Sequence, residues 1–339
     1  MSWKTTLYDY VHFRNQTDID YSTEPMLPFV EDRAYLESQA KLLSRREDTD
    51  KGRRFVPLKN ETRLSISGTS EQNGRVIADI ILKRSSVGTI GQDQVEEKRV
   101  EKERVTLVPG DGDWVIARIE PADTEEALRI RASVPGALMQ ADDTFAEVGL
   151  MSAPSVPFLS PRVIPSMQAA SRIPYNRERA AEYADRWWEQ SNPAYIHFEV
   201  NCSNYVSQCL FAGGAPMNYT GKRNSGWWYR GRVGGQEHWS FSWAVADSLQ
   251  FYLLTSRSGL RAVEVGSAGQ LELGDVISYD WEGDGRFQHS TVVTAIDPNG
   301  MPLVNAHTVS SKHRYWSYTD SPAWTERTRY RFLHILDTL

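Results

Sequence analysis

The sequence predicts an α+β protein built from two domains. Its 339 residues are more than one compact unit usually holds. In the first half, a segment with a helical apolar period precedes four strand-like runs joined by turn residues. In the second half, three helical segments precede four more strand-like runs. This order is typical of helices packed on an antiparallel sheet.

Residues 1–150 are predicted to form a small accessory domain. In EDRAYLESQAKLLSRRE (31–47), Leu36, Ala40 and Leu43 recur at helical spacing on one side. Four strand-like runs follow, separated by TSEQNG, GTIGQDQ and PGDGD, as in an antiparallel meander. A helix followed by such a meander has the element order of cystatin-like folds. No nucleophile, metal cluster or phosphate loop stands out in this domain, so we expect it to mediate protein contact.

A linker is predicted at residues 151–174, MSAPSVPFLSPRVIPSMQAASRIP. The segment holds five prolines and five serines and follows neither a helical nor a strand period. Because proline fixes φ and has no N–H to donate, such a segment is semi-extended. The second domain then spans residues 175–339.

The second domain is predicted to begin with helices and to end with a sheet. Asn176 is suited to cap a first helix over 175–193, a second helix carries both cysteines, and a third spans 240–256. Strand-like runs follow at 271–281, 288–297, 301–310 and 329–336. The sequence DPNG (297–300) is suited to a tight turn between the middle two runs. These elements predict an α+β domain with an antiparallel sheet.

Composition and charge argue against several classes of function. The net charge of −6 gives no support for nucleic-acid binding, which usually shows a basic face. No run of about 18 apolar residues occurs, so no membrane span is predicted. The first 20 residues lack the apolar core of an export signal, which predicts a cytoplasmic protein unless a leader was removed or export takes another route. The scattered histidines and the Gly-Asp turns lack metal-ligand spacing, so neither metal nor cofactor is predicted.

Both cysteines lie in HFEVNCSNYVSQCLFAGG (197–214), seven residues apart on one predicted helix. At about 1.5 Å per residue they are roughly 10 Å apart, too far for a disulfide. Asn201 would cap this helix and place Cys202 in its first turn, where free N–H groups and the helix dipole lower a thiol pKa. Cys209 has no such polar surroundings and is predicted to be structural. The alternative is that both thiols are buried core side chains.

A nucleophilic thiol needs a base, and His289 is the candidate. It lies after a polar, glycine-containing loop at the start of a strand-like run. The DPNG turn folds the next strand back, which brings residue 289 opposite roughly 305–308. Asn305 and His307 are two apart on that strand and share a face, so either could orient the imidazole. The alternative for His289 is a surface histidine where a loop meets a strand.

Tryptophan is concentrated in the second half of the chain. Nine of the eleven tryptophans lie between Trp187 and Trp324. Packing of an aromatic core would explain most of them, whereas an aromatic-walled groove for sugar or peptide would explain those in Gly- and Ser-rich surroundings. On the second interpretation, Trp227, Trp228 and Trp281 are candidate substrate-binding residues.

A helix-borne cysteine, a strand histidine and a polar residue on the next strand, in that order, resemble the NlpC and CHAP branches of the papain-like cysteine peptidases and amidases. Residues 175–335 more closely resemble the bacterial "Putative amidase domain" family, on the motifs YNRERAAEYADRWW, CSNYVSQCLFAGGAPM, GWWY, SFSW, HSTVVT and PLVNAHT. The resemblance implies a papain-like domain with Cys202 as nucleophile and His289 as general base. It also implies Asn305 as the third member, with His307 as its rival.

The activity implied by this resemblance is hydrolysis of an amide bond through a thioester acyl-enzyme, without a cofactor. Peptidoglycan-type peptides are the implied substrates. One departure is Asn201, where the family usually has aspartate; a neutral amide there should ease thiolate formation slightly. Two alternatives use the same fold: a peptide- or glycan-binding module without turnover, and an acyltransferase with the same triad.

Overall fold

The computed structural model describes residues 2–122, 125 and 173–339. The predicted linker at 151–174 therefore lies outside the described residues except for its last two, and the boundary there stays a prediction. The chain divides into two compact units: Met1–Glu125 with Val309–Trp324, and Glu126–Thr308 with Thr325–Leu339. Each unit combines helices with antiparallel strands, which confirms the predicted α+β class. Within the described ranges, no helix is both long and apolar enough to cross a bilayer.

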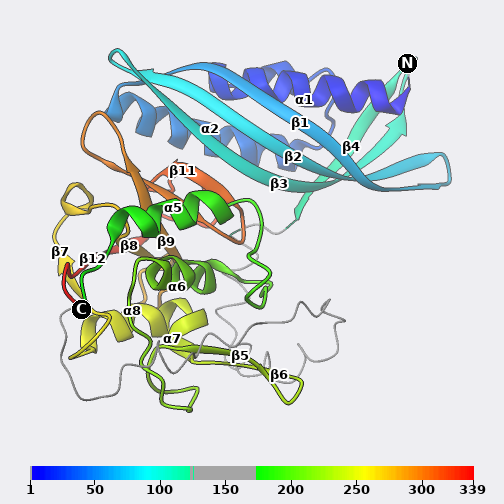
Figure 1. The fold of residues 1–339 in the computed structure, drawn as a ribbon. Helices are drawn as coiled ribbons and strands as arrows, with labels where there is room; N and C mark the ends of the chain where they lie inside the picture. The colour runs from blue at the N-terminus through cyan, green and yellow to red at the C-terminus, as the bar shows by residue number, and fades with distance from the viewer. Residues whose placement is uncertain (1, 123–124, 126–172) are drawn as a thin grey trace. The chain divides into compact units, whose positions relative to one another are not determined.

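The first unit packs two helices on a sheet of long strands (Figure 1). The helices are α1 (Trp3–Asp20) and α2 (Arg33–Arg53), with a short 3-10 turn at Glu24–Met26 between them. The strands are β1 (Phe55–Gln72), β2 (Arg75–Ile90), β3 (Asp93–Pro109) and β4 (Trp114–Ala122). Each strand pairs antiparallel with the next, so the predicted helix and four-stranded meander are confirmed. Asn73 and Gly74, both at positive φ, form the two-residue turn between β1 and β2.

Helix α1 was not predicted, because its inward face mixes apolar side chains with charged ones. Leu7 and Tyr10 pack into the core, whereas Arg14 and Asp18 are buried beside them on the same helix. The charges have partners on the sheet: Glu101 and Glu103 for Arg14, and Arg84 for Asp18. A search for hydrophobic period alone misses a helix that meets its sheet partly through ion pairs.

The segment Val309–Trp324 belongs to the first unit although it comes late in the chain. Its strand β11 (Ser311–Tyr315) pairs with β3 at Lys98 and Arg99. Buried Arg314 binds Asp320 at 2.9 Å and also Glu125. Burial would raise the pKa of Asp320, but Arg314 and Arg99 hold that pKa well below its usual range. Paired charges therefore anchor this segment, and no motif in the sequence indicated which unit it joins.

In its described residues, the second unit contains four α-helices and a group of antiparallel strands. The helices are α5 (Arg177–Trp187), α6 (Cys202–Ala212), α7 (Phe241–Ala244) and α8 (Ala246–Thr255). Asn176 caps α5 as predicted, its side chain accepting the Arg179 N–H at 2.8 Å. The single helix predicted at 240–256 was wrong, because Val245 takes an extended conformation between α7 and α8.

The strands of the second unit are antiparallel throughout, in the order β10, β9, β8, β12, β7. Their bounds are Ala262–Val265 for β7, Val276–Asp280 for β8, His289–Ile296 for β9, Pro302–Ala306 for β10 and Arg329–Ile335 for β12. A hairpin of β5 (Tyr229–Val233) and β6 (Gln236–Trp239) stands apart. Neither this hairpin nor β7 was predicted. The hairpin of β9 and β10 is confirmed: Gly300 donates its N–H to the Asp297 carbonyl at 2.8 Å, and Asn305 faces Val292.

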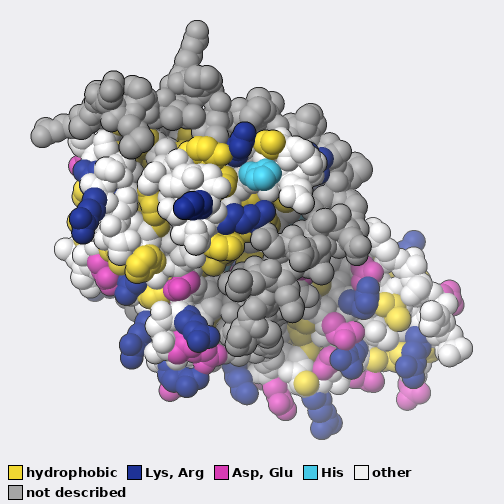
Figure 2. Space-filling model, turned by 90° about the horizontal axis from the view of Figure 1, so that it is seen from below, with side chains coloured by type: hydrophobic (Ala, Val, Ile, Leu, Met, Phe, Trp, Pro, Cys, Tyr) yellow, Lys and Arg dark blue, Asp and Glu magenta, His cyan; other side chains and the backbone are white. Residues whose placement is uncertain are grey.

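Charged side chains are mixed with hydrophobic ones on the face drawn in Figure 2, where cations and anions both occur over its described part. Such a mixture is typical of a solvated surface, in line with a net charge of only −6. The apolar side chains of the second unit gather inside instead, in a core rich in tryptophan and tyrosine beneath α6.

Candidate active site

Cys202 is the first residue of α6, and Asn201 occupies the N-cap position, as predicted. The Asn201 side chain does not cap the helix, however. Its Oδ1 accepts the N–H of Phe198 at 3.1 Å and the amide Nδ2 of Asn204 at 2.8 Å. Cys202 is only 2% exposed, and its sulfur lies 3.8 Å from the Ser203 hydroxyl. The start of α6 is thus tied to the preceding loop.

Burial raises the pKa of the Cys202 thiol above its ordinary value. Hydrogen bonds from the backbone N–H groups of Ser290, Ser203 and Cys202 itself, and from the Ser203 hydroxyl, act in the lowering direction. The lowering expected at a helix start is therefore present but smaller than the cost of removing sulfur from water. At neutral pH the resting sulfur is a thiol, and attack on a carbonyl would require a base.

His289 is the first residue of β9 and is buried, with 4% exposed. The peptide that joins it to Ser290 lies at the Cys202 sulfur, because the Ser290 N–H is one of the groups that lower the thiol pKa. The structure thus brings the backbone of His289 next to Cys202. It does not place His289 on the surface, which was the alternative to a catalytic role.

The side chain of His289 lies on the sheet face away from α6. Ser290 accepts a hydrogen bond from Ser203 on α6 at 3.4 Å, so Ser290 points toward that helix. Strand alternation then directs His289 to the opposite face, where it pairs with Tyr279 on β8. Its ring centroid lies 5.4 Å from that of Tyr279 and 5.9 Å from that of Trp281, with 23° between the planes of the imidazole and the indole. Two aromatic rings therefore hold the imidazole.

Asn305 lies on β10 opposite Val292, three residues along β9 from His289. Its Oδ1 accepts from the Thr294 hydroxyl at 2.8 Å, and its Nδ2 donates to Asp185 on α5, also at 2.8 Å. Asn305 therefore lies on the face of the sheet that α5 and α6 cover. An orienting role toward His289 stays a prediction.

His307 follows β10 and makes contacts to other groups through both ring nitrogens. Its Nδ1 lies 2.8 Å from the amide Nδ2 of Asn201, and its Nε2 lies 2.6 Å from the carbonyl oxygen of Trp187. The ring stacks on Tyr205 with centroids 4.0 Å apart and 13° between planes. Burial lowers the pKa of His307 to about 4, so the imidazole is neutral at neutral pH. Its partners thus connect the loop before α6 to the end of α5.

The three candidate substrate-binding tryptophans are buried. Trp227 donates its Nε1–H to Ser207 at 3.0 Å and packs 4.9 Å from the ring of Trp243. Trp228 donates to the carbonyl of Ser225 at 3.0 Å. These contacts favour the core-packing alternative for both, whereas Trp281 forms one wall beside the His289 imidazole. Contact with a substrate stays a prediction for all three.

Sequence reasoning missed the groups that hold the candidate residues. Asp185 binds Asn305, and the Trp187 carbonyl binds His307, across sequence separations of 120 residues in each case. No local sequence motif predicts hydrogen bonds between residues so far apart in the chain. Only Asn201 carried a signal, through its position before the helix, and that signal indicated a cap rather than a bond to His307.

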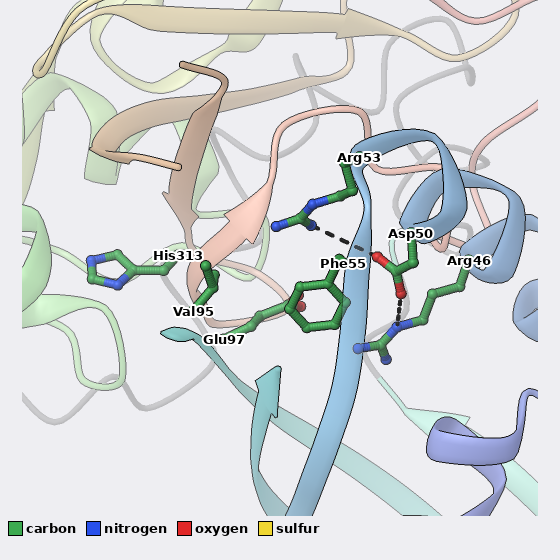
Figure 3. A pocket seen from close by; sticks show the side chains of 7 residues that line it. All are labelled: Arg46, Asp50, Arg53, Phe55, Val95, Glu97 and His313. Atoms are coloured by element: carbon green, nitrogen blue, oxygen red, sulfur yellow. Dashed lines mark ion pairs between the residues drawn. The ribbon is translucent and has the colours of Figure 1, made fainter. Parts of the chain in front are cut away.

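A small cavity lies in the first unit, and Figure 3 shows the side chains that line it. Its volume is about 10 Å³, near the lower limit for one water molecule. Asp50 lies between two guanidinium groups, 3.5 Å from Arg46 and 3.8 Å from Arg53. The cavity is too small for a peptide. Among the residues that the structure describes, no cluster of three or more His, Cys, Asp or Glu side chains is arranged to hold a metal ion.

Comparison with known proteins places the candidate residues within a described family domain. Residues 174–333 match the model of the family described as "Putative amidase domain". Cys202, His289, Asn305 and His307 all fall inside this range, and so does the segment that joins the first unit.

One matched relative is the uncharacterized protein YhbB of Bacillus subtilis (strain 168). It is 55% identical over 163 residues, which are 48% of this chain and 51% of that protein. The chain therefore spans about half the length of this curated relative. Among solved structures, the intermembrane space region of the chloroplast protein ARC6 matches 36% of this chain and 96% of its own, at 13% identity and a TM-score of 0.26, which does not establish a shared fold.

Proposed function

We propose that this chain is a cysteine-dependent amidase or peptidase that uses Cys202 as nucleophile and His289 as general base. The observation that carries the proposal is the position of Cys202 at the start of α6, where backbone N–H groups surround the sulfur. The match of residues 174–333 to an amidase family supports the class of reaction. His289 begins the strand whose next residue reaches the sulfur, which supports its role as the base.

In the proposed reaction, His289 takes the thiol proton of Cys202 as the sulfur attacks the amide carbonyl carbon. The carbonyl electrons move to oxygen, and N–H groups at the start of α6 stabilise the oxyanion, a contribution of about 3 kcal/mol per donor. The imidazolium gives its proton to the leaving amine as the C–N bond breaks, which leaves a thioester. Water, deprotonated by His289, then attacks the thioester and releases the acid and the free thiol.

Substrate entry is proposed to rearrange the site. Cys202 and His289 are almost wholly buried, so a substrate must displace the side chains that cover them. The imidazole now lies against Trp281 on the face away from α6, and rotation about χ1 leaves Cβ on that face. The proposed rearrangement therefore also turns the backbone at His289, the first residue of β9, so that the ring approaches the sulfur. The hydrogen bond between a catalytic nucleophile and its base often becomes short only when substrate is bound.

Asn305 is the better candidate for the third member of the triad. It lies on the strand paired with β9, on the sheet face that α6 covers, which is the face to which the proposed backbone turn would bring the His289 ring. The rival His307 already has Asn201 and the Trp187 carbonyl on its two ring nitrogens. We therefore assign Asn305 the role of holding the imidazole tautomer during proton transfer.

The finer fold assignments also belong to this proposal. A nucleophile at the start of a helix that packs on an antiparallel sheet supports a papain-like arrangement of the NlpC and CHAP type for the second unit. Two helices on a four-stranded meander support a cystatin-like accessory unit, for which we propose protein contact as the role. Peptidoglycan-type peptides are the proposed substrates.

The test is hydrolysis of a panel of peptidoglycan-type peptides and simple N-acyl amides by the full chain. Cys202→Ala should lower the rate of amine release about a thousandfold or more, because removal of a nucleophile removes the covalent step. Cys209→Ala is the matched control and should keep most of the activity. Intact-mass measurement after an acid quench should detect an acyl group on Cys202.

Other outcomes would replace the proposal. If Cys202→Ala binds a panel peptide as tightly as the wild type and neither protein releases amine, the chain is a binding module. If an added amine is acylated in preference to water, the chain is an acyltransferase. Unchanged hydrolysis by Cys202→Ala would exclude Cys202 as the nucleophile.

A further inference from the structure

The hydrogen bonds of His307 determine the position of its proton. The Trp187 carbonyl can only accept, so the proton of the neutral ring is on Nε2. Nδ1 is then an acceptor, and the only groups that Asn201 can offer to it are the N–H bonds of its Nδ2. The orientation of the Asn201 amide follows, because its Oδ1 must face the N–H of Phe198 and the Nδ2 of Asn204.

The backbone of Asn201 is also held where the chain begins α6. The N–H of Asn201 is held by the hydroxyl of Thr308 at 3.1 Å, which is the residue after His307. The carbonyl of Asn201 accepts the first hydrogen bond of the helix, from Tyr205 at 3.0 Å. The residue before Cys202 is thus tied through its backbone and its side chain to the end of β10.

We propose that His307 is a positioning residue that keeps the first turn of α6 in place through Asn201, and that it does not act on His289. The inference rests on the proposed function in that Cys202 is the group being positioned. The ring must stay neutral for this role, because a proton on Nδ1 would face the N–H bonds of Asn201. The other groups that face the ring are Tyr205, which stacks on it, and His197, whose charge would oppose its protonation.

Two substitutions separate the two hydrogen bonds of the ring. His307→Asn places an amide oxygen near the position of Nδ1 and can still accept from Asn201. His307→Gln places an amide nitrogen near the position of Nε2 and can still donate to the Trp187 carbonyl. If the bond to Asn201 positions Cys202, the glutamine variant should disturb the thiol and the asparagine variant should not.

The readout is the rate at which iodoacetamide alkylates Cys202 in the full-length protein at fixed pH. We expect His307→Gln to change this rate about tenfold, roughly the value of one hydrogen bond, and His307→Asn to stay within about twofold of the wild type. The two cysteines fall in one tryptic peptide, since no Lys or Arg lies between 187 and 222, so fragment ions must assign the label. Melting temperatures serve as the control, because a purely structural role would destabilise both variants without separating their alkylation rates.

Equal alkylation rates in the two variants would overturn the inference. So would equal loss of hydrolysis in both variants with the alkylation rate of Cys202 unchanged, since that pattern belongs to a group acting on the base. Failure of the proposed function would give a different result. Cys202→Ala would then retain hydrolysis, but His307→Gln would still change the alkylation rate of Cys202 more than His307→Asn does.

Discussion

The first and third turns of α6 each hold a buried cysteine, yet their surroundings differ in kind. Cys202 is 2% exposed and Cys209 is 0% exposed. Around Cys202 stand the N–H groups of its own turn and of Ser290. Cys209 lies in the aromatic core, where burial raises the pKa of its thiol well above the ordinary value and Asp185 raises it further. Burial alone therefore does not distinguish the two thiols; the polar groups within reach of each sulfur do.

The largest effect expected from this comparison is in thiol reactivity. Alkylation of Cys209 in the native protein requires unfolding of the core, so we expect Cys202 to react about a thousandfold faster or more. The rate at Cys202 should rise with pH, with a midpoint above that of an ordinary thiol, because burial dominates its pKa. Iodoacetamide labelling followed by mass spectrometry measures both rates. Comparable rates at the two sites would remove the distinction, and a midpoint below that of an ordinary thiol would indicate a preformed ion pair with His289.

A second prediction concerns how the free energy of unfolding depends on pH through His307, which contacts Asn201 at the start of α6. The pKa of His307 is about 4 in the folded protein, against an ordinary value of 6.5. Between these values the unfolded chain binds a proton that the folded chain does not, so the free energy of unfolding falls as the pH is lowered from 6.5 to 4. The loss approaches about 3 kcal/mol. Urea unfolding of the wild type and of His307→Gln at pH 7, 5.5 and 4.5 measures this loss. The free energy of unfolding should fall less steeply with decreasing pH in the variant than in the wild type. Equal slopes would contradict the lowered pKa of His307.

The smallest expected effect is on packing. Cys209→Ala removes a sulfur atom from a close-packed core and should cost roughly 1–2 kcal/mol of unfolding free energy at neutral pH. Cys202→Ala removes a sulfur that lies outside the apolar core cluster and accepts only weak hydrogen bonds from backbone N–H groups, so it should cost less. Urea unfolding of both variants in parallel provides the measurement. A larger loss of unfolding free energy for Cys202→Ala would indicate that the first turn of α6 contributes more to stability than the third.

Periodicity and turn chemistry predicted the elements that depend on local sequence. The helix at Asn176, the start of α6 at Cys202 and the turn at Asp297 follow from capping and turn residues within a few positions. The break between α7 and α8 was not predicted, because valine is not a residue that usually ends a helix. Helix α1 was not predicted, because Arg14 and Asp18 occupy inward positions at which an amphipathic helix usually has apolar residues.

The amino-acid sequence by itself determined that a cysteine begins a helix and that a histidine begins a strand, since both depend on neighbouring residues. Only the tertiary structure decided what those side chains meet. His307 turned out to hold Asn201, and Asn305 to hold Asp185, because folding brings together groups more than 100 residues apart. The direction of the Cys202 pKa shift was decided in the same way: the helix start is local, but the loss of water around the sulfur depends on every element packed over it.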